Sequence, residues 1–71
     1  MVRKKAKVLF FDDNRGRGIL KLLDSGKRLS IDYKNIKMEG FKILYEGQIV
    51  IVELDRDRVT VIPEEEDGNK V

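Results

Sequence analysis

Five short apolar runs, separated by turn residues, constrain the fold of this chain more than any other feature. The run RLSIDY alternates strictly, with Leu29, Ile31 and Tyr33 on one side and Ser30 and Asp32 on the other. Alternation with a period of two is typical of a strand that is buried on one face. The run KVLFF is apolar and aromatic, QIVIVEL and VTVI are rich in β-branched residues, as strands are, and RGILKLL continues the apolar pattern. We therefore expect strands at 7–11, 17–23, 28–33, 48–54 and 59–62.

The segments between these runs carry turn signals. DDNRG follows the first run, DSG at 24–26 follows the second, and DRDR at 55–58 follows the fourth. Residues 34–46 show no sustained helical stripe, and we expect a long connection with one helical turn there. Five strands without a convincing helix predict an all-β chain that folds as a small five-stranded antiparallel OB-fold barrel.

Length and charge divide the chain into a body and a tail. The 71 residues suffice for one domain, which we expect at residues 1–62. The stretch EEEDGNKV has no apolar residue before its final valine, so residues 63–71 are expected to form an acidic, disordered tail. Residues 1–53 carry 12 Lys/Arg and 7 Asp/Glu, whereas residues 54–71 carry 3 and 6. The basic body can attract phosphate groups.

The composition argues against an enzyme. Cysteine and histidine are absent, which excludes disulfides, thiolate nucleophiles, histidine bases and nearly every zinc site. Asp12 and Asp13 are adjacent and would point to opposite faces of a strand, so they are poor partners for acid–base catalysis. The glycine pattern at 16–18 lacks the third glycine and the helix of a dinucleotide site. We expect no catalytic residue, metal or cofactor.

The apolar runs also bear on location. None approaches the roughly 20 residues of a membrane span. The basic and then apolar N-terminus is interrupted by Asp12 and Asp13 too early for a signal peptide. A cytoplasmic protein without a membrane partner is the expectation.

The stretch GFKILYEGQIVIVEL, at 40–54, resembles the cold-shock domain family, whose usual form there is close to G-F/Y-K-x-L-x-E-G-Q-x-V. Eight residues fit that form directly: Gly40, Phe41, Lys42, Leu44, Glu46, Gly47, Gln48 and Val50. The resemblance runs without a gap from Lys7 to Leu54. A barrel of the bacterial translation-initiation-factor type has similar length, but the stretch 40–48 argues against it.

The two ribonucleoprotein motifs of that family are heavily altered. RGRGIL, at 15–20, stands where the family usually has K-G-F-G-F-I, and LSIDY, at 29–33, stands where it has V-F-V-H-F. In the family these motifs form an aromatic platform for single-stranded RNA or DNA. The resemblance thus implies a nucleic-acid-binding barrel with a depleted platform.

Three aromatic residues remain at platform positions. Phe10 replaces the family's tryptophan, Tyr33 stands in for a phenylalanine, and Phe41 is retained. Four other positions have lost their rings: Arg17, Ile19, Ser30 and Asp32. Since each stacked base contributes roughly 1–3 kcal/mol, we expect weak to moderate binding with little sequence specificity.

The resemblance also suggests which charges face the nucleic acid. Four cations are expected to contribute: Lys7, Arg15, Arg17 and Lys42. The guanidinium of Arg17 can stack on a base and pair with phosphate. Lys21 and Lys34 are interpreted as ordinary surface charges. Asp12 and Asp32 are expected to oppose phosphate.

Each of these assignments has a simpler alternative. Core packing is the expected role of Phe11 and an alternative role for Tyr33. Gly16 and Gly18 are expected to serve a bend or bulge of the barrel. A second functional hypothesis is a protein-interaction or regulatory module that kept the barrel and lost most nucleic-acid binding. It is favoured because Ile19, Ser30 and Asp32 turn an aromatic face into a mixed polar and apolar one.

Overall fold

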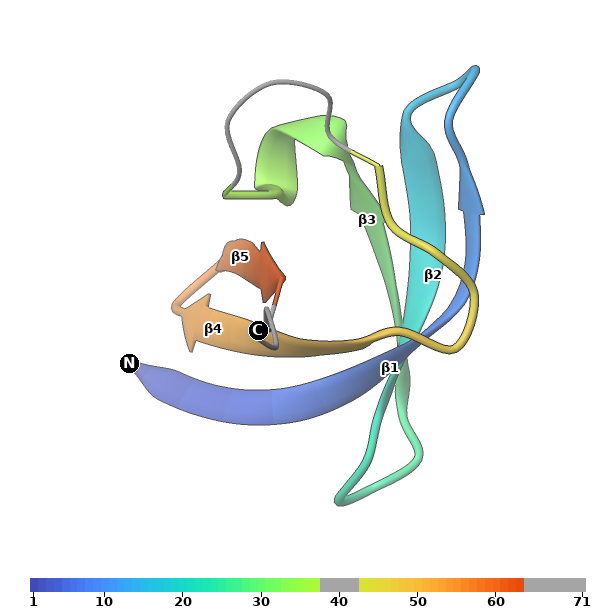
Figure 1. Cartoon of the computed structure of the whole chain (residues 1–71). Helices are drawn as coiled ribbons and strands as arrows, with labels where there is room; N and C mark the ends of the chain where they lie inside the picture. The colour runs from blue at the N-terminus through green and yellow to red at the C-terminus, as the bar shows by residue number, and fades with distance from the viewer. Residues whose placement is uncertain (38–42, 64–71) are drawn as a thin grey trace, which may run out of the picture.

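The computed structural model describes residues 1–37 and 43–63. Its elements follow the order β1 (Val2–Asp12), β2 (Arg17–Leu22), β3 (Arg28–Asp32), η1 (Tyr33–Asn35), β4 (Ile49–Asp55) and β5 (Arg58–Pro63). The strands form one antiparallel sheet in the order β3-β2-β1-β4-β5. The sheet curls into a half-barrel (Figure 1), which confirms the predicted all-β, five-stranded fold.

The first strand is longer than expected and holds the two halves of the sheet together. It begins at Val2 rather than at Lys7, so the strand prediction of 7–11 was too short. Its residues 2–7 pair with β4, and its residues 6–12 pair with β2. The strand bends strongly along its length (Figure 1), so one continuous segment belongs to both sides of the half-barrel.

The concave side of the sheet holds the core. Its buried side chains come from all five strands and from the connection between β3 and β4. They are Ala6, Val8, Leu20, Leu22, Ile31, Ile36, Leu44, Val50, Val52 and Val61. Phe11 packs against this cluster, as predicted.

The short helix η1 closes the open side of the half-barrel. Ile36, at its end, forms a parallel bridge with Val61 of β5. The side-chain amide of Asn35 donates a hydrogen bond to the carbonyl oxygen of Val59 at 3.0 Å. The backbone N–H of Lys37 donates to the carbonyl oxygen of Val61 at 2.7 Å. These contacts join β3 to β5, which are the two ends of the sheet order.

The connections differ from the predictions in detail. The helical turn expected within 34–46 is present as η1, but it begins at Tyr33, so that residue leaves the predicted strand 28–33. The β4–β5 turn is tighter than expected, because both Asp55 and Arg58 belong to strands. The strand β5 extends through Pro63. The predicted acidic tail remains a prediction, since residues 64–71 lie outside the described residues.

Candidate nucleic-acid interface

Nine side chains of β1, β2 and β3 form the convex side of this part of the sheet, which we call the outer face. Residues directly opposite each other in adjacent strands lie on the same side of a sheet, so the register arranges the nine in three rows. The Arg17 row is Asp12, Arg17 and Asp32; the central row is Phe10, Ile19 and Ser30; the basic row is Lys7, Lys21 and Arg28. The buried residues of β2 alternate with these and face the core.

A β-bulge places Phe10 on the outer face. Lys7 and Phe10 are three residues apart, and a regular strand would point them to opposite sides. The register with β2 shifts between Val8 and Phe10, so that Leu9 is the extra residue. Phe10 is therefore 51% exposed, whereas Phe11 packs toward the core.

Gly18 makes this arrangement possible. A Cβ added there would lie 2.3 Å from the carbonyl oxygen of Phe10 and 2.8 Å from the ring of Phe11. Backbone atoms cannot move aside as a side-chain end can, so only glycine fits this close approach. The prediction that Gly18 serves a bulge is confirmed.

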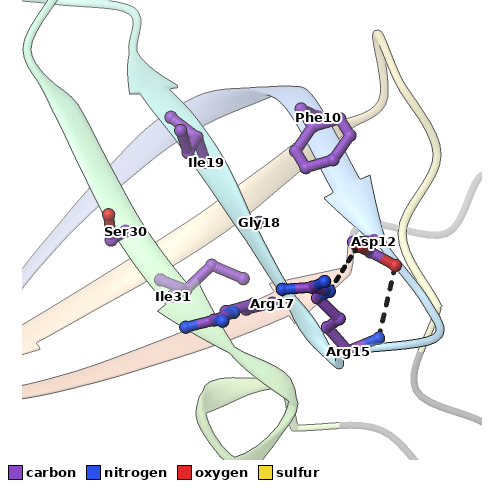
Figure 2. Close-up of a pocket in the computed structure, with 8 residues that line it drawn as sticks. All are labelled: Phe10, Asp12, Arg15, Arg17, Gly18, Ile19, Ser30 and Ile31. Carbon is purple, nitrogen blue, oxygen red and sulfur yellow. Dashed lines mark hydrogen bonds and ion pairs between the residues drawn. The ribbon is translucent and has the colours of Figure 1, made fainter.

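Phe10, Arg15 and Arg17 meet at a shallow pocket of about 490 Å³ (Figure 2). Asp12, Gly18, Ile19, Ser30 and Ile31 complete its lining. The volume lies within the range of pockets that hold small organic ligands. The pocket combines an exposed aromatic ring with two guanidinium groups, which suits a flat, partly polar group such as a nucleobase.

Asp12 organises the turn that carries Arg15. Its carboxylate accepts hydrogen bonds from the backbone N–H groups of Asn14, at 3.1 Å, and Arg15, at 3.3 Å. The guanidinium of Arg15 lies 3.7 Å from the same carboxylate (Figure 2). The charge of Arg15 is thus partly offset within the protein.

Arg17 lies between two carboxylates in its row but is bound to neither. Asp12 and Asp32 are its Cα partners on either side. Across residues 1–37 and 43–63, no ion pair within 4.0 Å involves Arg17. Its guanidinium remains available to a ligand in the pocket.

Asp32 has a structural role that the sequence analysis missed. Its carboxylate accepts a hydrogen bond from the backbone N–H of Lys34 at 2.8 Å, and its own N–H donates to the side chain of Asn35 at 2.8 Å. These bonds form a capping box at the start of η1. The pattern D-x-x-N at 32–35 is the signal that could have indicated the cap.

Tyr33 lies outside the pocket, beyond the Arg17 row. Its ring packs over Gly16, where an added Cβ would be 2.8 Å from the ring carbon Cδ1, and its N–H donates to the carbonyl oxygen of Gly16 at 2.7 Å. The side chain is 47% exposed, so the alternative of core packing was wrong. Gly16 has a φ of +70°, which favours glycine and agrees with the predicted bend.

Three predicted site residues remain: Lys7, Phe41 and Lys42. Lys7 is exposed in the basic row, on the other side of Phe10 from the pocket arginines. Phe41 and Lys42 lie outside the described residues. Arg28 was not among the predicted cations; the observed register of the β2–β3 hairpin sets it opposite Lys21.

Two kinds of feature are absent from residues 1–37 and 43–63. No helix there is long and apolar enough to cross a membrane. No group of three or more His, Cys, Asp or Glu residues in those ranges could hold a metal ion.

Comparison with known proteins gives two curated relatives. A cold shock-like protein of Thermotoga maritima is 37% identical over 54 residues, which cover 76% of this chain and 80% of the relative. The chain belongs to the cold-shock protein family. The cold shock-like protein CspC of Buchnera aphidicola subsp. Acyrthosiphon pisum is 33% identical over 54 residues, or 76% of this chain and 78% of that relative. A scan against protein-family models found no match.

Membership of the cold-shock family confirms the resemblance drawn from residues 7–54. It agrees with the five-stranded antiparallel half-barrel described above. Within this cold-shock fold, the outer face of β1, β2 and β3 carries both altered ribonucleoprotein motifs, because these motifs form β2 and β3.

Proposed function

We propose that this cold-shock protein binds single-stranded RNA or DNA on the outer face of β1, β2 and β3. The observation that carries the proposal is the pocket in which the half-exposed ring of Phe10 lies beside Arg15 and Arg17. Single-strand binders combine aromatic rings, on which bases stack, with a positively charged surface that follows the phosphates. Both features lie on this face.

The chemistry of the pocket suggests modest affinity. Phe10 offers one exposed ring for stacking, and Arg17 offers a planar guanidinium that can stack on a second base or bond its edge. Ile19 and Ser30, which share the central row with Phe10, add contact area without an aromatic face. Because stacking tolerates any base, we expect weak to moderate binding with little sequence preference.

A titration with labelled single strands tests the proposal. Pyrimidine-rich DNA and RNA oligonucleotides of equal length are titrated with the protein, and fluorescence anisotropy is followed at about 50 mM salt and again at about 200 mM. We expect saturable binding that weakens at the higher salt concentration. Absence of binding at low salt and about 100 μM protein, a concentration that detects even non-specific complexes, would contradict the proposal.

A protein-interaction module is the second candidate function. The observation in its favour is Ile19, a large apolar side chain that is 37% exposed in the centre of the outer face, beside Phe10. Co-purification of one stoichiometric protein partner, lost in an Ile19→Asp variant, together with no oligonucleotide binding, would favour this candidate.

A further inference from the structure

Charged residues that pair across the strands have opposite signs, except in two pairs that share Lys21. In the strand registers, six pairs bring two charged residues face to face. Four of them combine opposite signs: Arg3 with Glu53, Asp12 with Arg17, Arg17 with Asp32, and Asp55 with Arg58. The other two, Lys7 with Lys21 and Lys21 with Arg28, combine like charges and share one residue.

These two pairs make the basic row a continuous line of three cations across three strands. Side chains directly opposite each other have Cβ atoms roughly 5 Å apart, and like charges at that spacing destabilise a sheet. All three residues are exposed. Among the described residues, none of the three takes part in an ion pair within 4.0 Å. The repulsion in this row is therefore unrelieved within the described part of the protein.

The outer face is also asymmetric about Phe10. On one side of the central row lies the basic row, with three positive charges. On the other side lies the Arg17 row, in which two carboxylates flank one guanidinium, and Arg15 beside Asp12 brings the charges there into balance. A polyanion laid on this face therefore gains most where the three cations stand.

We propose that the phosphate backbone of a bound single strand runs over Lys7, Lys21 and Arg28, while its bases extend across the central row toward the Arg17 pocket. This inference rests on the proposed function and adds the path and orientation of the strand. It assigns phosphate binding to Lys21 and Arg28, and it places Arg17 at the bases rather than at the phosphates.

The test compares two double variants that each remove two positive charges. Lys21→Gln with Arg28→Gln removes two members of the basic row. Lys37→Gln with Arg58→Gln is the matched control, because both residues are exposed and lie off the outer face. Binding of a pyrimidine-rich DNA oligonucleotide is measured as a function of salt concentration. Each phosphate contact contributes about 0.7 to the slope of log K against log salt for single strands.

We expect the basic-row variant to lose about 1.4 from that slope, for two phosphate contacts, while the control variant keeps the slope of the unchanged protein. An abasic phosphodiester oligomer supplies a second arm. Its binding should weaken in the basic-row variant and should be unaffected by Phe10→Ala, since it has no base to stack. Equal slopes for the two double variants would overturn the phosphate path.

The same experiment separates this inference from the function on which it rests. If the unchanged protein binds oligonucleotide and Phe10→Ala weakens that binding, but the basic-row variant behaves like its control, only the path is wrong. If the unchanged protein binds neither ligand, both proposals fail.

A stability measurement without ligand tests the repulsion in the basic row directly. Because the basic-row variant relieves this repulsion, its urea midpoint at low salt should be higher than that of the unchanged protein. Added salt screens the charges, so the difference between the two midpoints should shrink. A midpoint at low salt no higher than that of the unchanged protein would contradict the unrelieved repulsion.

Discussion

Phe10 is the residue on which binding depends most directly. Its ring is half exposed because the bulge at Leu9 turns it outward. Phe10→Ala removes a stacking surface and little core, so we expect a loss of about 1–3 kcal/mol, or roughly 5- to 150-fold in affinity, with the fold retained. Anisotropy titration measures the affinity, and circular dichroism checks the fold.

Leu23 offers the matched control for that change. It is 50% exposed and lies just beyond β2, outside the nine residues of the outer face. Leu23→Ala should leave oligonucleotide affinity unchanged. Equal losses in the two variants would mean that Phe10 contributes no specific stacking.

Gly18 is the residue on which the shape of the face depends. Gly18→Ala places a methyl group against the backbone oxygen of Phe10, and we expect a destabilisation of about 1–3 kcal/mol from this overpacking. Gly47→Ala is the comparison, because nothing lies within 4 Å of an added Cβ there and only its positive φ opposes the change. Urea unfolding should rank Gly18→Ala as the less stable variant; the reverse order would contradict the role assigned to the bulge.

Single residues show where sequence reasoning succeeded and where it stopped. Phe10 and Phe11 are adjacent and chemically identical, and alternation alone does not say which one faces outward. The resemblance to the cold-shock pattern assigned Phe10 to the platform and Phe11 to the core, and their exposures agree. From the same pattern Asp32 was expected only to place a negative charge on the platform. Its role as the N-cap of η1 was missed, because that role depends on the helical turn that follows it.

At the scale of elements, Asp32 joins β3 to η1. Asp32→Ala removes the cap and should cost about 1 kcal/mol of unfolding free energy. Asp32→Asn keeps a side-chain oxygen for the cap but removes the negative charge beside Arg17. We therefore expect Asp32→Asn to stay near the stability of the unchanged protein and to bind oligonucleotide more tightly, as measured by urea unfolding and anisotropy. Weaker binding by a stable Asp32→Asn variant would show that the carboxylate assists the ligand.

A second contact between elements depends on pH. Lys4 of β1 donates a hydrogen bond of 2.6 Å to the carboxylate of Asp24, in the β2–β3 turn, and this bond is the main cause that lowers the pKa of Asp24 below its usual value. A carboxyl group with a lowered pKa stabilises the fold above its unfolded-state pKa, and that contribution is lost as the pH falls through the folded-state pKa.

Asp24→Asn should accordingly lower the urea midpoint at pH 7. The effect should be small, because both side chains are partly exposed to solvent. The difference from the unchanged protein should disappear in acid, once Asp24 itself is protonated. Urea unfolding curves of both proteins, recorded from pH 7 down to the acid pH at which Asp24 is protonated, measure this difference in midpoint. A difference that persists at the acid end would assign the effect to something other than the ion pair.

The elements also divide into those that the sequence could predict and those that it could not. The β2–β3 hairpin follows from the turn at 24–26, but its register, which sets Lys21 opposite Arg28, does not, because a hairpin centred on Ser25 would set Lys21 opposite Leu29. The N-terminal half of β1 was missed because Arg3, Lys4 and Lys5 break any alternation. That half is a strand because it pairs with β4, and such long-range pairing overrides local pattern.

At the scale of the whole molecule, the half-barrel separates two kinds of surface. The concave side is apolar and buried, whereas the outer face of β1, β2 and β3 carries the exposed ring of Phe10 and four cations. The β4–β5 hairpin has its turn at Arg56 and Asp57, on strands that contribute nothing to the outer face. A ligand on the outer face should leave that turn unaffected.

Amide chemical-shift mapping during a titration with a short single-stranded oligonucleotide tests binding on the outer face most directly. The largest shifts are expected at Phe10, Arg17, Ile19 and Ser30, with smaller shifts along the basic row and none at Arg56 and Asp57. Shifts centred on the β4–β5 hairpin, or no shifts at low salt, would contradict binding on the outer face.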